Sequence, residues 1–194
     1  MIPHNNTRRA LIASALALTA MAAGPTFAAD QAPPQKITEA DVREAAEAWG
    51  KGLVSIAVAY DGNEANIDKA KAVASAFIDK AYGYGLGPVL FKPTLTRDPQ
   101  TFRLTKKGAM AYFVGHDPDY PFDDGFALKP WRSVTFGPVG IQINGAVANT
   151  MGKLELRDAT GATTVVDKTW VFKKDERGVV RVIVHHSSLP YTGY

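Results

Sequence analysis

Cysteine is absent from this 194-residue sequence. Disulfides, thiolate metal sites and a cysteine nucleophile are therefore excluded. Stability must come from packing, and the hydrophobic share of 46% is sufficient for a sizeable core. After removal of a leader the length suits one domain, which we expect over residues 37–194.

Histidine is also scarce, which limits the metal sites that the chain can build. His4 lies in a predicted signal peptide, so the mature protein retains only His116, His185 and His186. Zinc takes about three or four protein ligands, and adjacent residues of a regular strand point to opposite faces. We therefore expect no metal. If one is bound, His185 and His186 are the candidate ligands, and the strand must then bend between them.

Several familiar site patterns are missing. Gly83, Gly85 and Gly87 follow a predicted helix, whereas the glycines of a dinucleotide-binding loop follow a strand. There is no Gly-x-Ser-x-Gly motif. The aspartates between residues 117 and 124 lack the EF-hand spacing, so we expect a solvated acidic loop rather than a calcium site.

The first 28 residues resemble a secretory signal peptide. Arg8 and Arg9 precede an apolar stretch over residues 10–23, and residues 26–28 fit a cleavage site. We expect cleavage near Ala28, a tail over residues 29–36, and a periplasmic or secreted protein. The two arginines suit either general or twin-arginine export.

Neither a membrane nor a nucleic acid is expected as a partner. The apolar stretch is too short to span a bilayer, and no other segment is long enough. Without Arg8 and Arg9 the formal charge is almost balanced, so the chain lacks the strongly basic character typical of nucleic-acid binding.

Helix-like periodicity comes first along the mature chain, and strand-like runs follow. Apolar spacings of three and four residues predict one helix from Thr38, with a capping-box partner in Asp41, to Tyr60, and another over residues 67–81. An extended segment at 89–94 and a helix over 105–114, capped by Thr105, come next. Turn signals separate four predicted strands, over residues 134–144, 146–157, 163–173 and 179–187. This order predicts an α+β fold in which a curved antiparallel sheet packs on the helices and encloses an apolar cavity.

The last predicted strand changes abruptly from β-branched residues to histidines and serines. Alternation places Arg181, Ile183, His185 and Ser187 on one face, and residues 182, 184, 186 and 188 on the other. Solvation of a chain end is the alternative explanation. The polar residues that this strand and the other segments offer for chemistry are Thr94, Tyr112, His185 and Ser187.

Five segments together resemble the iota-class carbonic anhydrases. These segments are Phe91-Lys-Pro-Thr94, Ala111-Tyr-Phe-Val-Gly115, Gly125-Phe-Ala-Leu with Pro130-Trp131, Met151-Gly152, and Val184-His-His-Ser-Ser-Leu-Pro-Tyr191. The class is similar to the calcium/calmodulin-dependent kinase II association domain and to SnoaL-like proteins, which share the cone-shaped fold of nuclear transport factor 2. The resemblance extends from Ile37 to Tyr191, and the His-His-Ser-Ser-Leu-Pro run is its most specific part.

The resemblance implies reversible hydration of carbon dioxide to bicarbonate, with Thr94, Tyr112 and Ser187 binding bicarbonate and His185 beside them. On this basis Tyr112 and Ser187 orient the water, Thr94 positions substrate oxygens, and His185 supports the network or relays the proton. Family members are described both as metal-free and as zinc or manganese enzymes, and the scarcity of histidine favours the metal-free form. We also expect a homodimer. The alternatives are a non-catalytic periplasmic binding or oligomerisation domain and a SnoaL-like isomerase.

Overall fold

The computed structural model describes Met1 and residues 35–193. The predicted signal peptide, its cleavage site at Ala28 and most of the predicted tail over residues 29–36 lie outside the described residues. Within the described residues, no helix has the length and apolar character needed to cross a membrane.

Three α-helices precede the main sheet, as the periodicity predicts. They are α1 (Glu39–Tyr60), α2 (Ile67–Ala81) and α3 (Lys106–Val114), with short 3₁₀ helices η1 (Glu64–Asn66) and η2 (Phe126–Leu128). Thr38 and Asp41 form the expected capping box at the start of α1. The Thr105 hydroxyl accepts a hydrogen bond from the Gly108 amide and caps α3. The local signals therefore predict both helix starts correctly.

The sheet has five strands in the order β1-β5-β4-β3-β2. Its strands are β1 (Leu90–Lys92), β2 (Trp131–Asn144), β3 (Val147–Asp158), β4 (Thr163–Lys174) and β5 (Val180–Ser188). Strands β2 to β5 form an antiparallel meander, whereas β1 pairs with β5 in parallel. The four predicted strands thus form the expected antiparallel meander, and the extended segment before α3 adds a fifth, parallel strand beside the last one.

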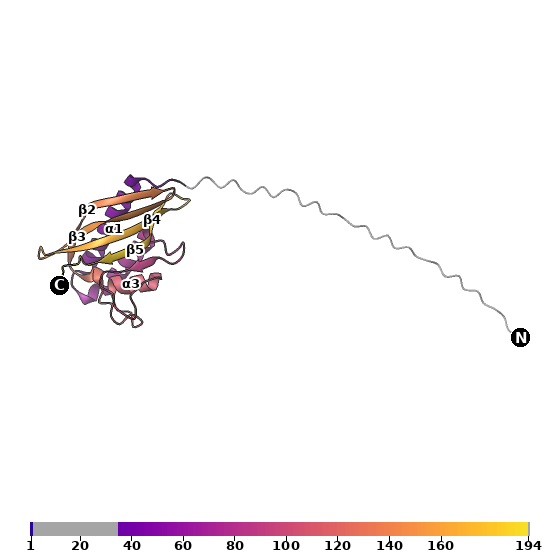
Figure 1. Cartoon of the computed structure of the whole chain (residues 1–194). Coiled ribbons are helices and arrows are strands. Elements are labelled where there is room, and N and C mark those ends of the chain that lie inside the picture. Colours follow the sequence, from indigo (N-terminus) through magenta and orange to yellow (C-terminus); the bar gives the residue numbers. More distant parts are fainter. Residues whose placement is uncertain (2–34, 194) are drawn as a thin grey trace. The chain divides into compact units, whose positions relative to one another are not determined.

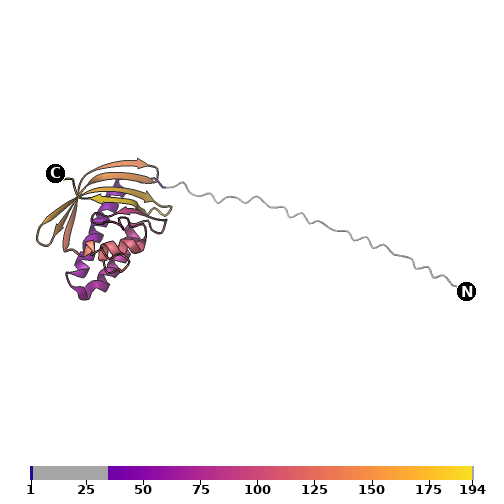
Figure 2. The same ribbon diagram turned by 60° about the horizontal axis from the view of Figure 1, so that its bottom comes forward.

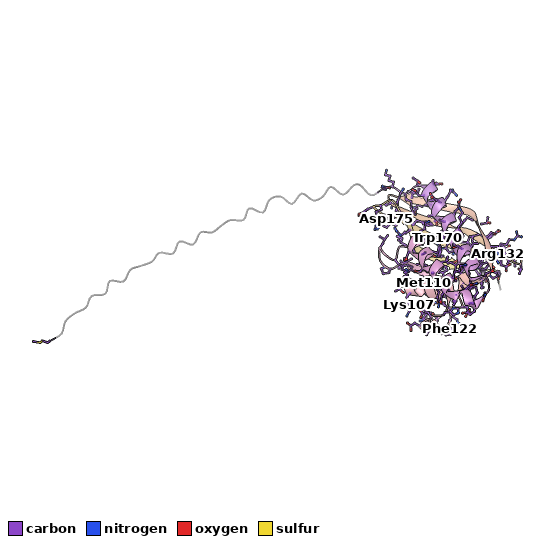
Figure 3. All side chains as sticks on the ribbon, turned by 180° about the vertical axis from the view of Figure 1, so that it is seen from behind. Lys107, Met110, Phe122, Arg132, Trp170 and Asp175 are labelled. Atoms are coloured by element: carbon purple, nitrogen blue, oxygen red, sulfur yellow. The ribbon has the colours of Figure 1, made fainter. Side chains whose placement is uncertain are left out.

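The helices cover one face of the curved sheet, and α1 runs along that face (Figures 1 and 2). Trp49, Leu53 and Ile56 of α1 are buried together with Leu154 and Phe172 of the sheet. Figure 3 shows the molecule from behind: Trp170 lies between Asp175 and Arg132, which are at opposite margins of the view. The core therefore lies between α1 and the inner face of the sheet.

A β-bulge at Ile183 changes which side chains of β5 face this core. Val184 pairs with Val171 and Val182 pairs with Phe172, so Ile183 is left without a partner in the β4 ladder. As a result Val182, rather than Ile183, is buried on the same side as the site residues further along the strand. The predicted alternation is correct at residues 185–188 and wrong at residues 181–183, because it assumed an unbroken pleat.

The loop after α3 is held by a buried ion pair. Arg103 and Asp123 form two hydrogen bonds of 2.9 and 2.7 Å, and both side chains are 2% exposed. The expectation of a fully solvated acidic loop is therefore wrong for Asp123. This pair fixes the loop between α3 and η2, the two elements that carry Tyr112 and Phe126.

Candidate functional site

The residues singled out in the sequence meet in one small cavity on the inner face of the sheet. Thr94 follows β1 and Ser187 is the penultimate residue of β5, and their hydroxyl oxygens are 2.6 Å apart. Ser187 is 1% exposed. The parallel pairing of β1 with β5 produces this contact between residues 93 positions apart.

Tyr112 reaches the same cavity from α3. Burial raises the pKa of its hydroxyl, although hydrogen bonds with the Thr94 side chain and with the backbone of Thr94 and Leu95 act in the opposite direction. Tyr112 is 4% exposed and is therefore a neutral hydrogen-bond donor at physiological pH. Three hydroxyls from three separate segments thus converge at one point.

Apolar side chains form the rest of the cavity wall. Five of its lining residues are apolar or aromatic, namely Trp49, Phe91, Pro93, Phe113 and Phe126, and they surround the polar groups Thr94, Tyr112, Lys168, His185 and Ser187. Such a cavity favours a small uncharged molecule, while its few donors can stabilise charge that develops on that molecule.

His185 is completely buried, and both of its ring nitrogens have partners. The ring stacks on Phe91, with centroids 4.4 Å apart and planes 16° apart. Its Nδ1 lies 2.8 Å from the Tyr82 hydroxyl, which accepts a hydrogen bond from the Trp49 indole N–H at 2.9 Å. Its Nε2 lies 2.7 Å from Nζ of Lys168. His185 therefore lines the cavity, but its polar atoms are held within a buried chain of side chains.

Lys168 is the site residue that the sequence analysis missed. Its Nζ lies 3.2 Å from the Ser187 hydroxyl as well as beside His185, and only 9% of the residue is exposed. The alternation of β4 could have revealed it. Residues 166, 168, 170 and 172 all face the core, and Lys168 is the charged one of the four, beside Val166, Trp170 and Phe172. A lysine on the apolar face of an alternating strand is unusual and indicates a function or a specific partner.

One set of hydrogen-bond directions gives the protons of this network an acceptor. Trp49 can only donate, so the Tyr82 hydroxyl accepts from it. Nδ1 of His185 lies 2.8 Å from the same hydroxyl, and the tautomer with Nδ1 unprotonated lets Tyr82 donate its own proton there. In that tautomer the neutral imidazole carries its proton on Nε2 and donates it to the lone pair of a neutral Lys168 amine. Burial lowers the pKa of Lys168 and of His185, which agrees with a neutral amine beside a neutral imidazole.

The two histidines of the conditional metal site are on opposite faces of β5. His185 is buried, whereas His186 is exposed on the outer face and pairs across the ladder with Thr169. The described residues contain no group of three or more histidines, cysteines, aspartates or glutamates that could hold a metal ion. The donor set around His185, a lysine and hydroxyls, does not fit zinc or manganese.

Comparison with known proteins identifies close relatives. A family model described as metal-independent carbonic anhydrase matches residues 40–189. A metal-independent carbonic anhydrase from Nostoc sp. is 53% identical over 155 residues, which cover 80% of this chain and 75% of the relative. A crystal structure of the iota-carbonic anhydrase from a cyanobacterium, complexed with bicarbonate, has 52% identity and a TM-score of 0.79, covering 81% of this chain and 95% of that chain.

A more distant structural neighbour shares the fold. The putative calcium/calmodulin dependent protein kinase II association domain from Xanthomonas campestris has a TM-score of 0.54 at 16% identity, covering 82% of this chain and 96% of that chain. This likeness confirms the predicted α+β fold, in which helices pack on a curved sheet as in the association domain.

Proposed function

This chain belongs to the metal-independent carbonic anhydrases, and we propose that its reaction takes place where Thr94, Tyr112 and Ser187 meet. The reaction is the hydration of carbon dioxide to bicarbonate and a proton, and it requires no metal cofactor. The observation that carries the assignment of the site is the convergence of three hydroxyls in a cavity with apolar walls.

The hydroxyls supply what a metal supplies in other carbonic anhydrases. Zinc lowers the pKa of bound water from about 15.7 to about 7. Without it, the site must orient the water and stabilise the negative charge that develops on the carbon dioxide oxygens. Tyr112 and Ser187 orient the water, and Thr94 donates a hydrogen bond to the substrate oxygens.

Bicarbonate binds in the same place. The cyanobacterial relative was crystallised with bicarbonate, and the Thr94, Tyr112 and Ser187 hydroxyls together provide donors and acceptors for a planar oxyanion. The 2.6 Å contact between Thr94 and Ser187 then opens so that each hydroxyl can bond to an oxygen of the ligand.

His185 acts as a positioning residue. Its ring nitrogens face Tyr82 and Lys168, so it fixes the Lys168 amine beside Ser187 rather than contacting the substrate through a nitrogen. This assigns the support role, rather than direct proton relay, to His185.

Stopped-flow hydration of carbon dioxide by the purified protein, before and after exhaustive chelation and with metal content measured, tests the assignment. Activity that survives metal removal supports the hydroxyl mechanism. Activity that is lost on chelation and restored by zinc or manganese contradicts it. Inactivity in both states would instead support a binding domain.

We also propose export to the periplasm with cleavage near Ala28, supported by Arg8, Arg9 and the apolar stretch that follows. Mass spectrometry of the exported protein should give a mature chain that begins at Ala29. A chain that retains Met1 in the cytoplasm would contradict this.

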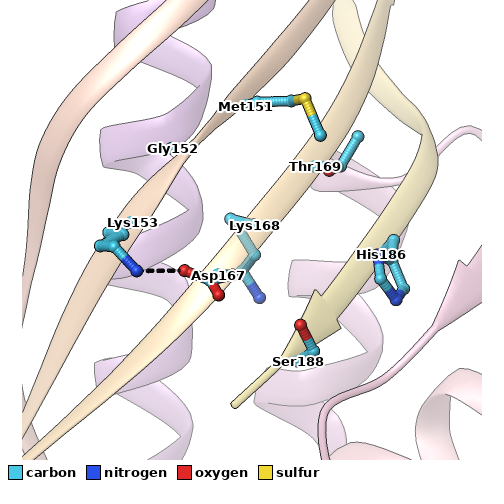
Figure 4. A pocket seen from close by; sticks show the side chains of 8 residues that line it. All are labelled: Met151, Gly152, Lys153, Asp167, Lys168, Thr169, His186 and Ser188. Carbon is cyan, nitrogen blue, oxygen red and sulfur yellow. Dashed lines mark hydrogen bonds and ion pairs between the residues drawn. The ribbon is translucent and has the colours of Figure 1, made fainter. Parts of the chain in front are cut away.

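A homodimer is proposed through the outer face of the sheet. Met151 of β3 is 69% exposed and Leu90 of β1 is 58% exposed, on the face that the helices leave uncovered. A hollow on this face is lined by residues of β3, β4 and β5 (Figure 4). Its Lys153 and Asp167 side chains form an ion pair, so the face offers both charges to a second copy.

Light scattering should give twice the monomer mass for the wild type, and Met151→Lys should give the monomer mass.

A further inference from the structure

Besides the hollow on the outer face (Figure 4), Lys168 borders two spaces on the inner side of the sheet. Its side chain lines the hydroxyl cavity, and it also lines a cleft of about 200 Å³ between α1 and the inner face of β2, β3 and β4. Tyr112 and Phe126 instead line both the cavity and a hollow beside the loop after α3. The cavity therefore has a lysine side and a tyrosine side, each next to a different opening.

The cleft on the lysine side has polar groups suited to water. Trp170 lines it, and the buried Trp170 indole N–H has no hydrogen-bond partner within the described residues. Thr150 adds a hydroxyl, and the exposed side chains of Arg43 and Glu47 stand at the α1 side. A cleft with these polar groups and an unused buried donor is a place where water can bind and conduct protons.

We propose that Lys168 accepts the proton released by hydration and returns it to the solvent through the cleft between α1 and the sheet. This inference rests on the proposed function, because it requires that carbon dioxide is hydrated at the hydroxyl cluster. It adds a catalytic base and a proton route to that reaction.

The step balances as follows. The water oxygen forms a bond to the carbon of carbon dioxide, one carbon–oxygen π pair moves onto an oxygen, and one water O–H bond breaks. That proton passes to the Ser187 hydroxyl, which gives its own proton to the Lys168 amine across their 3.2 Å contact. Rotation about Cε–Nζ turns the amine lone pair from His185 to Ser187. A buffer base in the cleft then removes the proton and restores the amine.

The surroundings of Lys168 stabilise the ammonium once it forms. Its Nζ lies 4.8 Å from the ring centroid of Trp49 and 5.4 Å from that of Trp170, so both rings provide cation–π interactions. The hydrogen-bond partners of Nζ within the described residues are His185 and Ser187, neither of them a carboxylate, so this stabilisation is moderate and the ammonium can release its proton again. The amine is thus suited to cycling between two states.

Titratable and charged groups face this route from several elements. They are Tyr82 after α2, Tyr112 of α3 and His185 of β5 around the cavity, and Arg43 and Glu47 of α1 and Lys153 of β3 around the cleft. The tests below therefore compare variants at fixed pH and do not depend on assigning a pH profile to one group.

The first test replaces the amine by an apolar side chain of similar length. We expect Lys168→Met to lower the rate of carbon dioxide hydration at least about 10-fold, the lower end of the effect of a general base. Lys173→Met is the matched control, because Lys173 lies on the same strand but is exposed. Thermal unfolding of each variant checks the fold. An inactive wild-type protein would refute the proposed function, whereas an active wild type with a fully active Lys168→Met would refute only the role of Lys168.

Chemical rescue separates a base from a packing residue. Lys168→Ala should regain activity in methylamine, and should regain less in 2,2,2-trifluoroethylamine at the same concentration of free amine, because the second amine is less basic. Equal rescue by both amines, or none by either, would show that Lys168 acts by filling space.

The exit route is tested by narrowing the cleft. Ala46 of α1 lines it, whereas Ala48 of the same helix is exposed elsewhere. Ala46→Phe should slow net hydration several-fold and leave the ¹³C exchange between carbon dioxide and bicarbonate at equilibrium unchanged, since that exchange needs no net proton release. Ala48→Phe should change neither rate. Equal slowing of both rates by Ala46→Phe, or of neither, would refute this exit.

Discussion

The Nζ of Lys168 lies 2.7 Å from Nε2 of His185, whose Nδ1 lies 2.8 Å from the Tyr82 hydroxyl. Trp49 must donate to Tyr82, and the tautomer with its proton on Nε2 lets Tyr82 donate to Nδ1 and the histidine donate to the lysine. A protonated lysine could only donate, so this tautomer requires a neutral amine. Burial, which lowers the pKa of Lys168, favours the same neutral form beside the Ser187 hydroxyl.

The neutral amine predicts how stability depends on pH. Burial lowers the pKa of Lys168 in the folded protein, whereas the unfolded chain regains the ordinary value of 10.5. The unfolded state thus binds one more proton between the folded pKa and 10.5, and the free energy of unfolding rises with pH by up to about 1.4 kcal/mol per pH unit in that window. Urea unfolding from pH 7 to 9.5 measures the slope.

The comparison with Lys168→Met isolates this contribution. The variant should lose the slope that Lys168 contributes, while Lys173→Met should keep it, because Lys173 is exposed in both states. Equal slopes in the wild type and in Lys168→Met would mean that the buried lysine is charged.

Ser187 and Ser188 form a matched pair of neighbours on opposite faces of β5. Ser187→Ala should lower carbon dioxide hydration by about 10² to 10³, the usual cost of removing one donor to a developing oxyanion. Ser188→Ala should leave the rate within about twofold of wild type, since Ser188 lies on the outer face. Stopped-flow assays of both variants test this, and similar losses in both would contradict the assigned faces.

Tyr112→Phe removes one hydroxyl and keeps the ring that stacks on Phe126. We expect a loss of about 10² in hydration rate, with little change in unfolding temperature. Tyr60→Phe is the control, because the Tyr60 hydroxyl bonds to Glu64 away from the cavity. An unchanged rate for Tyr112→Phe would exclude the tyrosine from the reaction.

His186→Ala tests whether this histidine is a metal ligand. His186 is exposed on the outer face, so its loss should leave both activity and metal content unchanged. A fall in activity accompanied by loss of bound zinc or manganese, measured by elemental analysis, would make His186 a ligand.

Asp123→Ala should destabilise the fold. It leaves the buried Arg103 charge unpaired, which costs about 3 to 5 kcal/mol. Lys153→Ala breaks the exposed pair with Asp167 and should cost less than about 1 kcal/mol. Urea unfolding of both variants at pH 7 measures the difference, and comparable losses would contradict the buried pair as a stabilising contact.

Local signals in the sequence predict most of the elements. The Thr38–Asp41 capping box, the Thr105 cap and the turns between strands each depend on neighbouring residues, so they can be read without the fold. The bulge at Ile183 has no such signal, because it depends on how β5 aligns with β4.

The sequence by itself determined the α+β order and the family, and it predicted the three hydroxyls as site residues, since periodicity and a specific C-terminal motif are local properties of the chain. Only the tertiary structure decided that Thr94 bonds Ser187, that His186 faces away from His185, and that Lys168 completes the site. These relations join residues far apart in the chain, and strand pairing and burial, rather than any residue's neighbours, create them.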